Sequence, residues 1–146
     1  MRGDKPGALV RVAAIVGAVL ALVAFSGCGR LDKDAVSTDL KTLQSATAEG
    51  MLVAGQAARS RAPADFIEIR TAELSKQAKD TADSLAETPT ESGFQDAATM
   101  GNEIGNRASE LLNALHSDPG NSNLATNVTH ELGTLSDEAE RTEASL

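Results

Sequence analysis

Residues 88–116, TPTESGFQDAATMGNEIGNRASELLNALH, decide the fold of this chain. Apolar or small residues recur in this stretch at alternating spacings of three and four, which is the period of an amphipathic helix. They are Phe94, Ala97, Gly101, Ile104, Ala108, Leu111 and Leu115. Thr88, Pro89 and Glu91 precede all of them as a candidate capping box with proline at the first helical position. The stretch therefore predicts a helix that begins at Pro89 and buries one face.

Three further segments after Cys28 carry the same period, and prolines separate them. The prolines are Pro63, Pro89 and Pro119, and the four segments are 31–62, 63–88, 89–118 and 119–146. Each proline stands where a helix can begin, and Asp118 or Ser122 is a candidate cap for the last helix. The remaining stripes are Val36, Leu40, Leu43, Thr47, Gly50, Ala54 and Ala57, then Ile67, Leu74, Ala78, Thr81 and Leu85 (widened by Phe66 and Ile69), then Leu124, Val128, Leu132, Leu135, Ala139 and Leu146.

Four amphipathic segments with short connections predict an all-α fold, an up-down antiparallel four-helix bundle over residues 33–146. Five glycines fall inside the expected helices, at positions 50, 55, 101, 105 and 133. Each costs up to ~1 kcal/mol relative to alanine, so either they permit close packing or the helices fray. Gly101 and Gly105 form a GxxxG pattern with polar neighbours. We expect a packing contact there, with a docking groove for a partner helix as the alternative.

The N-terminal segment has the charge and length pattern of a secretory signal. Positive residues at positions 2, 5 and 11 precede an uncharged, mostly apolar run over 12–25, and Ser26, Gly27 and Cys28 follow. This segment resembles the signal peptide and lipobox of bacterial lipoproteins, and the resemblance covers residues 1–28 only. It implies a diacylglyceryl group with palmitate-like chains on Cys28 and cleavage between Gly27 and Cys28. Residues 1–27 would then be a signal peptide helix, and residues 28–32 the lipidated cysteine and a short tether.

Such an anchor places everything after Cys28 on the extracytoplasmic face of the cell membrane, because the positive residues stay inside. Gly29 carries no aspartate retention signal, so a Gram-negative host could sort the protein to its outer membrane. An uncleaved anchor over 12–29, 18 uncharged residues long, would give the same topology. Ordinary signal cleavage with a free thiol on Cys28 is the third alternative.

Composition and motifs argue against several kinds of chemistry. The part from Cys28 onward has 20 acidic and 10 basic residues and no Trp or Tyr, so we expect no nucleic acid partner. His116 and His130 should lie about 13 Å apart along the helix axis, which is too far to share a metal. With one cysteine and no HExxH or Gly-x-Ser-x-Gly motif, we expect no metal, no cofactor and no enzyme activity.

By elimination, the sequence predicts a non-catalytic, membrane-anchored lipoprotein that acts as a helical interaction or adaptor module at the cell envelope. Its partners would be the membrane, through Cys28, and an unidentified envelope protein. The alternative is a carrier that holds a small apolar ligand inside the bundle. Small residues in the middle of the helices permit either close helix approach or a cavity. Because close approach offsets the cost of the glycines with added contacts, we expect a filled interior.

Overall fold

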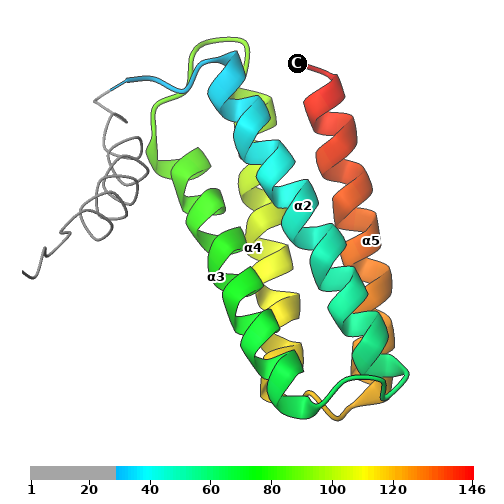
Figure 1. Ribbon diagram of the computed structural model, residues 1–146. Coiled ribbons are helices and arrows are strands. Elements are labelled where there is room, and N and C mark those ends of the chain that lie inside the picture. The colour runs from blue at the N-terminus through cyan, green and yellow to red at the C-terminus, as the bar shows by residue number, and fades with distance from the viewer. Residues whose placement is uncertain (1–28) are drawn as a thin grey trace, which may run out of the picture.

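The computed structural model describes residues 29–146, and these fold into four helices in up-down order (Figure 1). The helices are α2 (Lys33–Ala58), α3 (Ala64–Glu87), α4 (Gln95–Ser117) and α5 (Ser122–Ala144). α2 packs most extensively against α5, and α3 against α4. The predicted all-α antiparallel four-helix bundle is confirmed. The signal peptide over 1–27 and the lipidation site at Cys28 lie outside the described residues.

The apolar stripes meet in one core that runs along the bundle. Its most completely buried large side chains are Val36, Leu40, Leu43, Ile67, Ile104, Leu112, Leu115, Val128 and Leu132. Thr47 and Thr71 are buried among them, and each hydroxyl donates to a backbone carbonyl one turn earlier, on Leu43 and Ile67. Back-bonding of this kind satisfies a buried hydroxyl without a partner from another helix. Among the described residues, no buried side-chain polar atom lacks a hydrogen-bond partner.

The start of α4 differs from its prediction. The helix begins at Gln95 rather than at Pro89, and Thr88 instead follows the last residue of α3. Residues around Pro89 are extended because the chain before α2 pairs with them. The amide of Leu31 donates to the Pro89 carbonyl (2.7 Å), and the amide of Glu91 donates to the Leu31 carbonyl (2.9 Å). The expected capping box is therefore replaced by an isolated parallel bridge.

The cap of α5 was also predicted wrongly. Neither Asp118 nor Ser122 caps this helix. The side chain of Asn121 accepts a hydrogen bond from the Leu124 amide at 3.0 Å instead. Asp118 supports the cap, because its carboxylate accepts from the Asn121 side-chain amide at 2.9 Å.

The expected tether over 28–32 is partly folded into the bundle. Leu31 is only 9% exposed and joins the core cluster, and Asp32 caps α2 by accepting from the Ala35 amide. The Lys33 ammonium donates to the Leu146 carbonyl at 2.7 Å, which ties both ends of the described chain together. Of the described residues before α2, only Gly29 and Arg30 make no hydrogen bond to the bundle. No helix of the described part has the length and apolarity needed to cross a membrane.

Candidate functional site

Three glycines explain how the interior is filled. A methyl group at Gly101 would lie 2.6 Å from Leu85 Cδ1 of α3, and one at Gly105 would lie 2.8 Å from the Ala78 carbonyl oxygen. A methyl group at Gly50 would lie 3.0 Å from side chains of α4 and α5. These distances are shorter than van der Waals contact, so the helices approach too closely for a side chain. Gly101 and Gly105 are buried inside the bundle and face no free surface.

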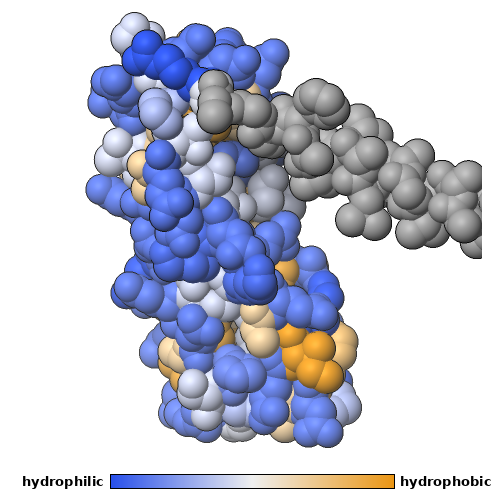
Figure 2. Space-filling view, turned by 90° about the vertical axis from the view of Figure 1, so that its left-hand side faces the viewer, coloured by the Kyte–Doolittle hydropathy of each residue, from blue (hydrophilic) through white to orange (hydrophobic). Residues whose placement is uncertain are grey.

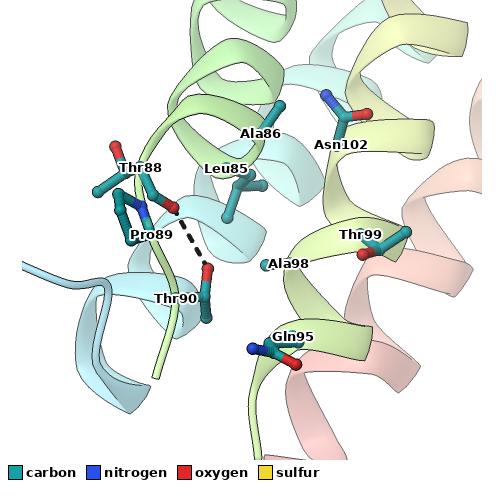
Figure 3. Close-up of a pocket in the computed structure, with 9 residues that line it drawn as sticks. All are labelled: Leu85, Ala86, Thr88, Pro89, Thr90, Gln95, Ala98, Thr99 and Asn102. Atoms are coloured by element: carbon teal, nitrogen blue, oxygen red, sulfur yellow. Dashed lines mark hydrogen bonds between the residues drawn. The ribbon is translucent and has the colours of Figure 1, made fainter. Parts of the chain in front are cut away.

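One open depression on the surface of residues 29–146 lies between the end of α3 and the start of α4, with a volume of about 310 Å³ (Figure 3). Thr88, Pro89 and Thr90 form one wall, and Gln95, Ala98, Thr99 and Asn102 of α4 form the other. Asn102 is engaged, because its amide nitrogen donates to the Ala82 carbonyl at 2.8 Å. The lining has no charged residue, so it offers neither a general acid nor a general base.

The second depression, of about 740 Å³, lies where the chain enters α2 and is lined by Arg30, Leu31, Asp39 and Ser84 among others. Ser84 donates its hydroxyl hydrogen to the Asp39 carboxylate at 3.2 Å. Partial burial raises the pKa of Asp39 above its ordinary value, and the hydrogen bond from Ser84 opposes this shift. A serine beside a carboxylate lacks the histidine that relays the proton in hydrolase triads. We interpret the pair as a structural link between α2 and α3.

The third depression is a furrow of about 680 Å³ along the seam between α2 and α5. Its lining comprises Met51, Gly55, Ala58 and Arg59 of α2 and Thr126, Thr129, His130, Gly133, Thr134 and Asp137 of α5. A methyl group at Gly133 would meet only the Met51 sulfur, at 3.3 Å, and one at Gly55 would meet only the Arg59 guanidinium, at 3.2 Å. Both neighbours are the far ends of flexible side chains. The glycines of the furrow are therefore not required for packing within the bundle.

Exposed apolar side chains gather on the seam between α2 and α3. Leu52 is 63% exposed, Ile69 59% and Phe66 42%. We call these three residues the apolar patch. The ion pair between Arg70 of α3 and Glu49 of α2 marks this seam. Leu52 lies three residues after Glu49, and Phe66 and Ile69 lie four residues and one residue before Arg70, so all three lie close to the pair along the helix axes. Figure 2 shows apolar surface on this side in the half of the bundle away from the point where the chain leaves toward Cys28.

Within the described residues, ion pairs link neighbouring helices at three points, one of which joins Lys41 of α2 to Glu143 of α5 at 3.2 Å. Arg70 pairs with Glu49 and Glu73, and these two carboxylates raise the pKa of its guanidinium, chiefly through the hydrogen bond with Glu49. Arg107 of α4 pairs with Glu131 of α5 and with Glu110. These pairs are solvent-exposed, so each contributes little to stability. They connect neighbouring helices at the surface of the bundle.

The two histidines lie on different seams. His116 is exposed near the end of α4, and its Nδ1 atom lies 3.0 Å from the Glu68 carbonyl of α3. His130 lines the furrow between α2 and α5. In residues 29–146, no three histidine, cysteine or carboxylate side chains are placed to hold a metal ion together.

Sequence reasoning identified Gly27, Cys28, Gly101 and Gly105 as residues of interest. The first two lie outside the described residues, and the two glycines lie in the interior. It found neither the furrow nor the apolar patch. The sequence pattern predicts that Phe66 and Ile69 widen the buried stripe, whereas both side chains are exposed. Comparison of the chain with protein-family models, with curated proteins and with solved structures finds no match.

Proposed function

We propose that this protein is a non-catalytic lipoprotein, held at the extracytoplasmic face of the cell membrane through Cys28, that acts as a helical adaptor for another envelope protein. The observation that carries the proposal is the apolar patch. Large apolar side chains are exposed at the far half of a bundle whose interior is filled by Leu85, Leu112 and their neighbours. Exposed apolar surface of this kind is typical of interaction sites.

The position of the patch suits a protein that presents itself from a membrane. Leu31 is docked onto the bundle, so only Gly29 and Arg30 separate Cys28 from folded structure. The patch lies toward the other end of α2 and at the start of α3. α2 has 26 residues and is therefore roughly 39 Å long. The anchor would hold one end at the lipid surface and leave the patch facing the surroundings.

The carrier alternative has less support. Glycines 50, 101 and 105 bring the helices into contact at mid-length, and the three depressions lie at the surface. A carrier of an apolar chain requires an enclosed apolar volume that shields most of its ligand. An enzyme would require a nucleophile or acid–base pair in a depression, and the Asp39–Ser84 pair is the nearest approach to one.

The test compares attachment and recognition separately in intact cells. A photo-cross-linking residue placed at Leu52 or Ile69 should capture a discrete partner, and the same residue at Asp80, which is exposed on the other half of α3, should not. Fatty-acid labelling should appear in the wild type and vanish in Cys28→Ser. Equal labelling of both proteins would overturn the anchor, and equal capture from Leu52 and Asp80 would overturn the adaptor.

A further inference from the structure

The furrow between α2 and α5 contains two glycines that the fold itself does not need. Glycine inside a helix is unfavourable relative to alanine. At Gly101 and Gly105 the close packing of the helices offsets that cost. A side chain at either position would collide with backbone or core atoms within 2.8 Å. At Gly55 and Gly133 only the ends of Arg59 and Met51 approach. Gly133 therefore leaves part of the floor of the furrow as partly exposed backbone, and Gly55 is buried beneath the side chain of Arg59.

The charges at the two ends of the furrow are opposite. Met51 of α2 lies beside Gly133 of α5. Gly55 lies one turn of α2 beyond Met51, and the Arg59 guanidinium lies over Gly55. Asp137 lies one turn of α5 beyond Gly133 in the opposite direction. At 1.5 Å per residue, the two charges are therefore about 12 Å apart along the seam. Within the described residues, neither side chain takes part in an ion pair.

From this arrangement we infer that the furrow is a docking site for one amphipathic α-helix of a partner protein. The helix carries small and apolar residues on the docking face, with an acidic residue against Arg59 and a basic residue against Asp137, two turns away. Two turns of helix span about 11 Å, which matches the charge separation. Met51 and the threonine methyl groups supply apolar walls, and the partly exposed Gly133 permits the close backbone approach that small-residue helix pairs use. The inference deepens the adaptor function and rests on it.

The probe is a synthetic helical peptide of 14 residues with an alanine and leucine face, a Glu and a Lys seven positions apart, and a benzophenone at its centre. Its control twin has Gln at both charged positions. Each peptide is cross-linked to the full chain held in lipid nanodiscs, and the cross-links are mapped by mass spectrometry. We expect cross-links on Met51, Thr129 and Thr134, with at least about tenfold lower yield for the neutral twin. Cross-links confined to the apolar patch, or equal yields, would overturn the inference.

Two variants of α5 separate docking from folding. Gly133→Leu fills the furrow, and its Cβ atom would meet only the flexible end of Met51, so the bundle should still fold without a lower Tm while the cross-links are abolished. Asn127→Leu adds the same side chain at an exposed position outside the furrow and should leave the cross-links unchanged. Unchanged cross-linking in Gly133→Leu would refute the furrow as the site. If the peptide gives no cross-links in the furrow of the wild type but Leu52 still captures a partner in cells, this inference fails and the adaptor function stands.

Discussion

Gly105 and Gly133 occupy similar contexts in the sequence and opposite contexts in the bundle. Both lie mid-helix, directly after a large apolar residue and two residues after a glutamate. Gly105 lies in a contact where α4 approaches the backbone of α3, whereas Gly133 faces a furrow where α5 leaves α2 room to spare. Glycine therefore permits close helix packing at position 105 and leaves an open furrow at position 133. Substitutions at the two sites should consequently have effects of opposite sign.

The strongest test of the packed side is an unpaired charge at its centre. Leu43 is 0% exposed, and its methyl groups lie 3.8 Å and 3.0 Å from the methyl positions of Gly101 and Gly105. Leu43→Asp should destabilise the bundle by several kcal/mol, on the order of its whole stability, because a buried carboxylate would have no partner. Loss of the helical circular dichroism signal at 25 °C would show this. Leu111→Asp should cost less because Leu111 is 9% exposed, and equal losses would contradict the burial difference.

Gly105→Ala tests the packed side more gently. The added methyl group would lie 2.8 Å from the Ala78 carbonyl oxygen and 2.8 Å from the Ala82 methyl group, so α3 and α4 would have to separate. We expect a net destabilisation of about 1–3 kcal/mol, even though alanine is the better helix former. Urea unfolding followed by circular dichroism measures the midpoint. A midpoint equal to or above that of the wild type would show that the interior has slack.

Gly133→Ala is the matched substitution on the furrow side and should have the opposite sign. The new methyl group would meet only the Met51 sulfur at 3.3 Å, and that side chain can move into the furrow. Stability should therefore rise by about 0.5–1 kcal/mol from helix propensity alone. The same urea experiment would detect the gain as a higher midpoint. A loss as large as that of Gly105→Ala would mean that α2 and α5 are packed as tightly as α3 and α4.

The sequence predicts much of this fold because the deciding signal is periodic and local. The stripes through Leu43, Ile104 and Val128 recur every three or four residues, and all three side chains are fully buried. Leu112 lies off the expected stripe and is still 0% exposed, because α4 contacts each of the other three helices. One helix seen alone does not reveal how many neighbours cover it, so the width of its buried face is set by the assembly.

The errors at the helix ends have a long-range cause. The residues at Thr88, Pro89 and Glu91 satisfy the local rules for a cap, yet the bridge to Leu31 uses the Pro89 carbonyl and the Glu91 amide. That contact joins positions nearly sixty residues apart. The furrow has the same origin, since Gly55 and Gly133 meet one seam only after α2 and α5 pair. Glycine spacing along one helix, as at Gly101 and Gly105, contains no information about such a seam.

Asp39 is half-buried, between the tight contact at Gly105 and the open furrow at Gly133. Its substitution has the smallest expected effect on stability. Burial between α2 and α3 raises its pKa above 3.8, so the folded chain binds a proton more tightly than the unfolded chain. By linkage, this group lowers stability as pH rises from 3.8 through the raised pKa, and its full cost remains above that value. Asp39→Asn removes the charge and keeps an oxygen that can accept from Ser84. Its Tm should therefore exceed that of the wild type slightly at pH 7, and the difference should shrink below pH 3.8. Thermal unfolding at pH 7 and pH 3 measures both values. A difference that is the same at both pH values, or absent at pH 7, would show that water reaches this seam as freely as it reaches the furrow.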